Sequence, residues 1–592
     1  MITSKISASE TTRRAGQDVT DIVEQGIVRD RRARLKLPSS QDAVSLLVLV
    51  FCGVLVLYPM VYLVVLSVNV GDPLTFPPEE LGIEHYQDLL ESWQVIANTA
   101  FVACIATVMA ILIGFLAAWA LTRTQLPGVA WLERLMQLPY YMTPLVGALA
   151  WSILAAPRTG FLNQLWHAVG AGGDLVNAYS AWGIAWVMAL FEGTVAFVMI
   201  SAAMKSMDPA LEESARVLGA GKWRVMLTVT LPLVLPGVAG AAVFVFAEML
   251  GSFAAAFVLG IPARFVVITT AIWQAVTMYP SDYGRAAALG IGLFAVMFLT
   301  LSLYRAAIRR GHFATISGKA FRPRAMQVGR LAWILFALCL AYVIAAVVLP
   351  LAVLLLTSFE RFATVILPQA EFTLANYETA FGFTAIRLAL TNSLILGVGV
   401  ATVGVAIMTV LVWIIYRSRA PGHGAIEYLV MFPQAVPRLV FGFALMQVWL
   451  IIPIPVYGTL WLMALAYFTV LMPLGVRTLA GVVLQVDKSL EECARVCGAS
   501  WGYRMRTVAL PLLRPGIIAA WLLVFIASVR ELGVSIFLVG SSAKVIAPSI
   551  IDAWLSSSST LSAALALIQS AAVFIALTIM LHAARRYSRE LP

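Results

Sequence analysis

The sequence predicts an all-α polytopic membrane protein of about twelve transmembrane helices, arranged as two parallel repeats of six. Three observations support this fold class: an apolar composition, a series of apolar segments long enough to cross a bilayer, and a repeat at fixed offsets. Of the 592 residues, 61% are hydrophobic and 12% are charged, whereas soluble proteins carry roughly 25% charged residues. The composition therefore indicates an integral membrane protein.

Apolar segments that can cross about 30 Å of hydrocarbon as helices form two series of six. The first series covers residues 44–69, 96–120, 138–156, 181–204, 234–259 and 284–305. The second covers residues 329–357, 386–416, 427–452, 457–481, 516–540 and 562–583. These series predict a tail (1–43), a first repeat (44–305), a basic linker (306–328), a second repeat (329–585) and a short C-terminal tail (586–592).

The distribution of charge predicts the orientation of the spans. Lysine and arginine collect in alternate loops, while the segment 70–95 has neither and carries six acidic residues. The positive-inside rule then places both termini in the cytosol. The net charge of +10 is explained by these loops, so we do not expect a nucleic-acid partner. The tail 1–43 mixes acids and bases, unlike a cleavable signal peptide.

The two series of spans are related by sequence. Leu231-Pro232 recurs as Leu510-Pro511 at an offset of 279, and Asn98 recurs as Asn392 at an offset of 294. The first half therefore has about 15 extra residues, which we assign to the Gly-rich outer loop at 157–180. Because each repeat contains an even number of spans, the two halves are parallel and related by an axis along the membrane normal.

The most specific motif lies in the loop after the fourth span of each half, at about 205–233 and 482–515. Its first copy is Glu213-Ser214-Ala215, then Gly219, Val229 and Leu231-Pro232. Its second copy is Glu492-Cys493-Ala494, then Gly498, Val508 and Leu510-Pro511, with the same spacing. Preceding aspartates and acidic pairs favour the start of a short helix. Gly219 and Gly498 are suited to a left-handed helix end.

This motif resembles the EAA loop of type I ATP-binding-cassette importer permeases, with Ser214 and Cys493 departing from it at the first alanine. The resemblance implies that each short helix docks into one subunit of a separate ATPase homodimer on the cytosolic face of a bacterial inner membrane, and that a soluble solute-binding protein delivers cargo to the outer face. The docking residues it implies are Glu212, Glu213, Ala215, Gly219, Glu491, Glu492, Ala494 and Gly498.

The chain has no Gly-x4-Gly-Lys-Ser/Thr phosphate-binding loop. We therefore expect a transport subunit rather than an enzyme, with no cofactor of its own, and ATP used by the partner. Five cysteines without ligand-like spacing indicate neither a disulfide framework nor a metal site.

The fused arrangement of two six-span halves resembles the ferric-iron permease family and its relatives for thiamine, 2-aminoethylphosphonate and polyamines. The basic linker and the sequence Arg530-Glu531-Leu532-Gly533 are similar to the iron and phosphonate branches. The resemblance implies ferric iron first, with thiamine, 2-aminoethylphosphonate or a polyamine as alternatives.

Ionisable residues inside spans are costly and usually serve a function. Glu192, Glu248, Arg438 and the pair Arg530-Glu531 are such residues. We predict that Glu248, Arg530 and Glu531 lie along the translocation pathway. The alternative is a purely structural role in which Arg530 pairs with a neighbouring acid to join helices.

Two other functional classes remain open from the sequence. An ion-coupled secondary transporter would also have two six-span halves, but it has no need for paired docking loops. A membrane scaffold could bind an ATPase without forming a pathway.

Overall fold

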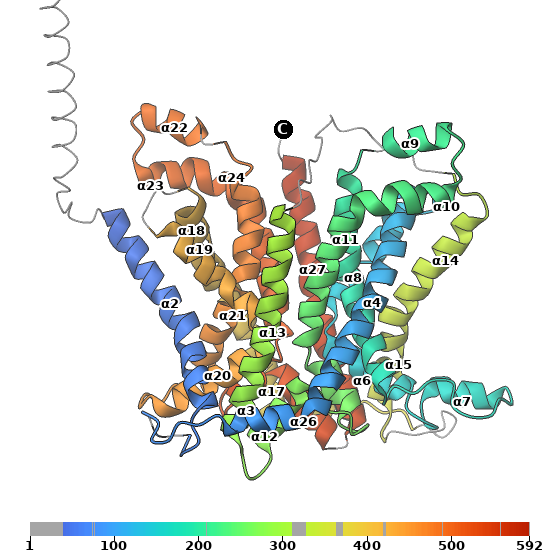
Figure 1. Cartoon of the computed structure of the whole chain (residues 1–592), viewed down its shortest axis with the longest axis horizontal. Helices are drawn as coiled ribbons and strands as arrows, with labels where there is room; N and C mark the ends of the chain where they lie inside the picture. Colours follow the sequence, from blue (N-terminus) through green and yellow to red (C-terminus); the bar gives the residue numbers. More distant parts are fainter. Residues whose placement is uncertain are drawn as a thin grey trace, which may run out of the picture.

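The computed structural model describes residues 40–310, 327–362, 371–417 and 422–590, apart from positions 74, 76, 209, 488 and 557. The described chain is a bundle of helices (Figure 1), with isolated bridges but no named strand among these residues. The all-α fold class is therefore confirmed. Most of the predicted tail 1–43 and linker 306–328 lies outside the described residues.

The first half begins with α2 (Ser40–Ser67) and α3 (Glu84–Glu91), and further helices follow up to residue 310. These are α4 (Trp93–Arg123), α5 (Val129–Leu135), η1 (Leu138–Tyr141), α6 (Pro144–Leu154), α7 (Phe161–Ala168), α8 (Ala181–Ser206), α9 (Ala210–Val217), α10 (Lys222–Val225), η2 (Met226–Thr230), α11 (Leu231–Leu250), η3 (Ala256–Gly260), α12 (Ile268–Thr277) and α13 (Tyr283–Arg310).

The second half repeats this order. Its helices are α14 (Leu331–Val343), η4 (Ile344–Val348), α15 (Leu349–Phe359), α16 (Ala375–Gly382), α17 (Thr384–Gly399), η6 (Val400–Gly404), α18 (Val405–Tyr416), α19 (His423–Met431), η7 (Phe432–Ala435), α20 (Arg438–Ile451), α21 (Leu460–Val483), α22 (Ser489–Val496), α23 (Trp501–Arg504), η8 (Met505–Ala509), α24 (Leu510–Val529), α25 (Ser535–Leu538), α26 (Ile546–Leu555) and α27 (Ser559–Glu590).

The third predicted segment of each half differs from a straight span. Ten helices of the described chain are long and apolar enough to cross a membrane, or eleven if one bent pair is counted as a span. Where 138–156 was expected to span, α6 has only 11 residues. Where 427–452 was expected to span, the chain bends by 106° before α20. Pro433 and Pro437 flank this bend, and proline favours such helix ends.

Equivalent hydrogen bonds in the two halves confirm the repeat. The Asn98 side chain donates to the Val266 carbonyl, and Asn392 donates to the carbonyls of Ser542 and Lys544. The extra residues of the first half are also where the repeat predicts them, because α7 lies in the loop between α6 and α8, whereas residues 452–459 between α20 and α21 contain no helix.

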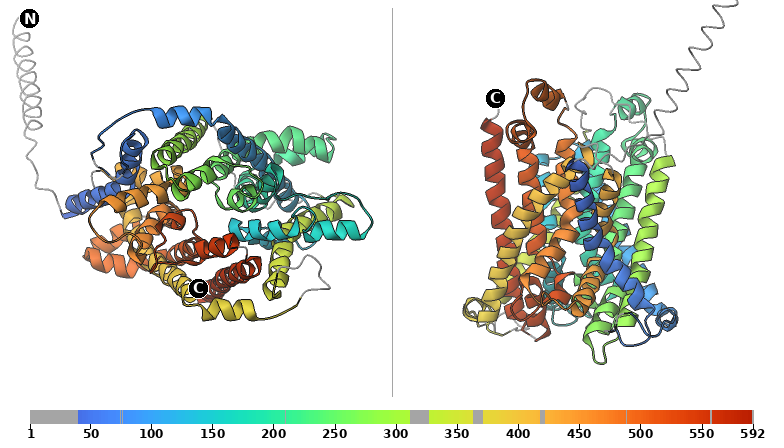
Figure 2. Two further views of the ribbon diagram at one scale, coloured as in Figure 1. Left: turned by 90° about the horizontal axis from the view of Figure 1, so that it is seen from below. Right: turned by 90° about the vertical axis from the view of Figure 1, so that its left-hand side faces the viewer.

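The first helix of each half packs against the other half. Helix α2 contacts α19 and α20, while α14 and α15 contact α4, α5 and α6. In the two views of Figure 2, α2 lies beside second-half helices and the start of the second half lies beside the first. The halves therefore interlock rather than meet at a flat surface.

The short helices α9 and α22 lie at the same end of the bundle and on opposite sides of it (Figure 1). At the other end lie α3, α7, α12 and α26. This arrangement agrees with two parallel repeats. We call α9 and α22 the coupling helices from here on.

Candidate functional site

A cavity of about 440 Å³ lies between the two halves. First-half residues from η1, α6, α8 and α11 line one side, and second-half residues from α20, α21 and α24 line the other. Helices α11 and α24 both end at this cavity, at Leu250 and Val529, and the following non-helical residues contribute to its wall. Irregular backbone inside a membrane protein is tolerated where it lines a cavity.

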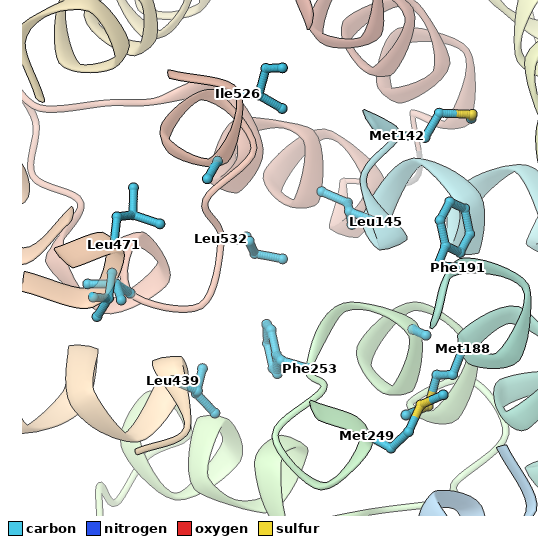
Figure 3. Close-up of a cluster of buried hydrophobic side chains, with 14 of the residues drawn as sticks. Met142, Leu145, Met188, Phe191, Met249, Phe253, Leu439, Leu471, Ile526 and Leu532 are labelled. Atoms are coloured by element: carbon cyan, nitrogen blue, oxygen red, sulfur yellow. The ribbon is translucent and has the colours of Figure 1, made fainter. Parts of the chain in front are cut away.

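Apolar side chains from both halves face one another around the cavity. Leu145 and Phe253 of the first half and Leu439 and Leu532 of the second half surround the open centre in Figure 3. The repeat relates these four residues in pairs, since Leu145 and Leu439 differ by 294 positions, and Phe253 and Leu532 differ by 279. The apolar part of the cavity is therefore two-fold symmetric in sequence.

The two halves contribute different charged residues to the cavity. The first half contributes two carboxylates, Glu192 and Glu248. The second half contributes three guanidinium groups and one carboxylate, from Arg438, Arg477, Arg530 and Glu531. The structure thus brings together every ionisable span residue that the sequence singled out, and adds Arg477.

Neither of the two first-half acids has a charged residue at the equivalent position of the second half. Glu192 corresponds to Leu471 and Glu248 to Ala527, both 279 positions later. In reverse, Arg530 and Glu531 correspond to Gly251 and Ser252. The cavity is consequently bipolar, with a wholly acidic first-half contribution and a mainly basic second-half one.

Two arginines of the second half are held by specific contacts. Arg438 Nη1 donates to Glu531 Oε2 at 2.8 Å. Arg530 donates to the carbonyl oxygens of Tyr140 and Met142, and its guanidinium lies 5.2 Å from the centre of the Tyr140 ring. Since Tyr140 belongs to the first half, Arg530 joins the halves across the cavity, through backbone carbonyls rather than through the acid that the structural alternative expected. A cation over an aromatic face adds to such a contact.

Glu192 is surrounded by the other charged groups. It interacts electrostatically with Glu248, Arg438 and Arg530. Within the described residues, no group of three or more His, Cys, Asp or Glu side chains is arranged to hold a metal ion. Glu192, Glu248 and Glu531 therefore do not form such a group.

The coupling helices have the local structure that the motif predicts. The Ala210 amide donates to Asp208 Oδ1, and the Ser489 amide donates to Asp487 Oδ1, both at 2.9 Å. The hydrogen bond from Ser489 lowers the pKa of the Asp487 carboxyl below its ordinary value, so this group is ionised at neutral pH. Each coupling helix therefore begins after an aspartate whose side chain accepts a hydrogen bond from an amide of the first turn.

Glycine ends both coupling helices. Gly219 has a φ of 83° and Gly498 a φ of 80°. The Ala220 amide donates to the Ala215 carbonyl, and the Ala499 amide to the Ala494 carbonyl. This six-to-one hydrogen bond defines a Schellman motif, which requires left-handed backbone at the glycine.

The paired glutamates of each coupling helix point in different directions. Glu212 is buried, whereas its neighbour Glu213 is exposed. In the second half, Glu491 is partly buried, and Glu492 is exposed. Glu212 and Glu491, which the sequence predicts to dock the ATPase, form ion pairs within this chain, with Arg123 and Arg417 respectively.

Sequence reasoning missed Arg123 and Arg417 as functional candidates and assigned them to the basic loops. They differ by 294 positions, so the repeat offset was the signal that could have found them. Tyr140 was also missed, because its role in the cavity depends on a contact with a residue 390 positions away.

Comparison with known proteins assigns the chain to a family. Residues 110–311 and 416–589 match the family model described as "Binding-protein-dependent transport system inner membrane component". The two matches fall one in each half and together cover more than half of the chain. The chain belongs to this family.

Two relatives are similar to this permease along most of its length, and a third is similar to 36% of it. A probable ABC transporter permease protein of Sinorhizobium fredii is 27% identical over 77% of this chain and 81% of its own length. The ferric transport system permease protein of Actinobacillus pleuropneumoniae is 24% identical over 85% and 72%. The molybdenum transport system permease protein of Escherichia coli is 32% identical over 36% of this chain and 90% of its own length.

The protein is thus the permease of a type I ABC importer with two fused halves, and a multi-pass protein of the inner membrane. Permeases of this kind work with an ATPase and a solute-binding protein, and their relatives are transport subunits. This family decides against an ion-coupled secondary transporter.

Proposed function

We propose that this permease carries ferric iron through the cavity between its halves, and that a separate ATPase dimer drives the passage by binding both coupling helices on the cytosolic face. The observation that carries the proposal is the similarity of the ferric transport permease, which extends through both halves of the chain. A similarity that spans both halves includes both walls of the cavity.

The cavity offers chemistry that suits a hard cation. Three carboxylates, Glu192, Glu248 and Glu531, line it. Hard cations prefer carboxylate, carbonyl and water oxygens as ligands. Because arginines line the same cavity, these acids would offer a cation only weak contacts, which suits passage better than storage. Glu248, Arg530 and Glu531 keep their proposed place along the pathway.

On the cytosolic face, the proposed docking surface consists of the exposed side of each coupling helix. Glu213 and Glu492 are exposed there, and Ala215 and Ala494 are half-buried. The glycine-terminated ends, at Gly219 and Gly498, set the direction in which the chain leaves the ATPase. The binding protein would approach the opposite face, where the acidic segment 70–95 lies, with both termini in the cytosol.

The bipolar cavity favours one other solute class. A zwitterion such as 2-aminoethylphosphonate carries an anionic and a cationic end, which match the basic second-half and acidic first-half contributions. Thiamine and polyamines carry positive charge without an anionic group to pair with the arginines.

Uptake measurements distinguish these solutes. A strain that lacks its own ferric and phosphonate importers would express the permease with its ATPase and binding protein. We expect accumulation of radiolabelled ferric iron that depends on ATP and is lost in the absence of the binding protein. Growth on 2-aminoethylphosphonate as sole phosphorus source without iron accumulation would replace ferric iron by the zwitterion. Molybdate uptake serves as the oxyanion control.

A further inference from the structure

Two arginines at equivalent positions approach the coupling helices from inside the membrane domain. Arg123 is the last residue of α4, and Arg417 follows α18 directly. Arg123 Nε lies 3.6 Å from Glu212 Oε1, and Arg417 Nη1 lies 3.5 Å from Glu491 Oε1. Both arginine side chains are buried, at 3% and 5% exposure.

The same guanidinium groups also hold the preceding span. Arg123 Nη2 donates to the carbonyl oxygens of Met204 and Met207, at 2.6 and 3.4 Å. Arg417 Nη2 donates to the carbonyls of Val483, at 2.6 Å, and Val486. These carbonyls lie at or just beyond the ends of α8 and α21, where the last turn of a helix leaves acceptors that a side-chain donor can reach. Each arginine therefore connects the second span, the end of the fourth span and the coupling helix.

The two connections differ at one position. Thr230 Oγ1 donates to Glu212 Oε1 at 2.6 Å, and both side chains are buried. The residue 279 positions after Thr230 is Ala509, which has no hydroxyl group. In agreement with this difference, the Glu212 side chain is 7% exposed and the Glu491 side chain is 21% exposed.

Thr230 extends the first connection towards the cavity. It is the last residue of η2, directly before α11, and α11 carries Glu248 to the cavity wall. The Thr230–Glu212 hydrogen bond therefore joins α9 to the start of α11, and a hydrogen bond to a carboxylate is stronger than one between neutral groups. In the second half, α22 reaches α24 without this bond.

We propose that Arg123 and Arg417 are positioning residues that make each coupling helix move together with its adjoining spans, and that Thr230 makes the first connection firmer than the second. Glu212 and Glu491 then act within the chain, while Glu213 and Glu492 face the ATPase. This proposal rests on the importer role of the permease and is independent of the solute.

The first test uses nitroxide labels at equivalent positions of the coupling helices. Cys493 is an exposed native cysteine, and Ser214 is its counterpart at the offset of 279. A chain with C52S, C104A, C339S and C497A keeps Cys493 as the site for one label; adding C493S and S214C moves the label to α9. The purified full chain in lipid nanodiscs is measured without any partner.

We expect the label on α9 to be less mobile than the label on α22. Thr230→Val should raise the mobility at position 214 to that of position 493, and Ala509→Thr should lower the mobility at position 493. In each variant, the ratio of immobile to mobile label should change by about tenfold, which corresponds to one hydrogen bond to a charged group. Unchanged mobility in both variants overturns the proposal, whatever the complex transports.

The second test measures coupling in the complete complex with ATPase and binding protein. Thr230→Val should lower ATP hydrolysis stimulated by the binding protein by about tenfold relative to basal hydrolysis, with an unchanged melting temperature. Arg123→Lys should restore less coupling than wild type, because lysine lacks the planar fork that reaches the carboxylate and the carbonyls together. Altered label mobility with unchanged stimulation of ATP hydrolysis would mean that Arg123, Arg417 and Thr230 only stabilise the structure, and would reject their role as positioning residues.

Discussion

Arg438 and Glu531 form an ion pair at 2.8 Å in which the partners differ in exposure, 46% for the arginine and 1% for the glutamate. Arg438 therefore presents charge to the cavity, while Glu531 lies behind it and also accepts a hydrogen bond from the Val534 amide. Glu531, which lines the cavity, therefore also holds Arg438 in place.

This relationship predicts an order of stabilities. Arg438→Ala leaves the Glu531 carboxylate buried without its cation, which costs about 3 kcal/mol. Arg438→Ala combined with Glu531→Gln removes that unpaired charge and should recover part of the loss. Thermal unfolding of the purified chains should rank wild type first, the double variant second and the single variant last. Equal melting temperatures for the single and double variants would contradict this reading.

Glu248 is predicted to act on the solute rather than on the fold. Glu248→Gln keeps the shape of a half-buried side chain and removes its charge, so uptake should fall by about tenfold with little change in melting temperature. Glu371→Gln is the matched control, because its exposed ion pair with Arg361 is remote from the cavity. Uptake rates in proteoliposomes decide the matter, and a rate equal to that of the control would remove Glu248 from the pathway.

The helix-ending glycines make a prediction with an internal control. Gly219→Ala and Gly498→Ala meet no atom within 4 Å, so any effect arises from the left-handed backbone. That strain costs about 1 kcal/mol per site and should weaken ATPase binding several-fold. Gly221→Ala also meets no atom, but its φ of −66° suits alanine. Calorimetric titration with the ATPase should leave the Gly221 variant at wild-type affinity.

The exposed glutamates are predicted to retain the ATPase. Replacing Glu213 and Glu492 together by alanine should release the ATPase during co-purification, because both charged contacts are lost. Glu133→Ala is the control, since Glu133 binds Lys205 at 2.5 Å outside the coupling helices. Single replacements should differ in their effect, because the two helices are tethered unequally. Retention of the ATPase by the double variant would place its dock elsewhere.

Local features of the fold could be predicted from the sequence. An aspartate, two glutamates and a glycine at fixed spacing determine a short helix through neighbouring backbone groups, and α9 and α22 have the predicted form. The bend before α20 could not be separated from a straight span by apolar composition, since a buried bent pair and a lipid-exposed helix are equally apolar.

The sequence predicts the candidate site only in part, because the site depends on contacts between residues that are distant in the chain. Glu212 and Glu213 are adjacent acids of the motif, and the inward orientation of Glu212 accompanies its contacts with Arg123, 89 positions earlier, and Thr230, 18 positions later. In the cavity, the cost of intramembrane charge identified Glu192 and Arg438 correctly as unusual. Their convergence on one cavity depends on the packing of both halves, which no pattern of spacing contains.

The bipolar cavity has a consequence for the ancestry of such a chain. Two copies of the first half would place four like charges around one passage, and two copies of the second half would surround it with six arginines and only two acids. Neither pairing reproduces the mixed lining. Fusion into a single polypeptide ensures that every cavity contains one half of each kind. The two halves could therefore become different in charge without forming mismatched pairs, which random association of separate subunits would produce.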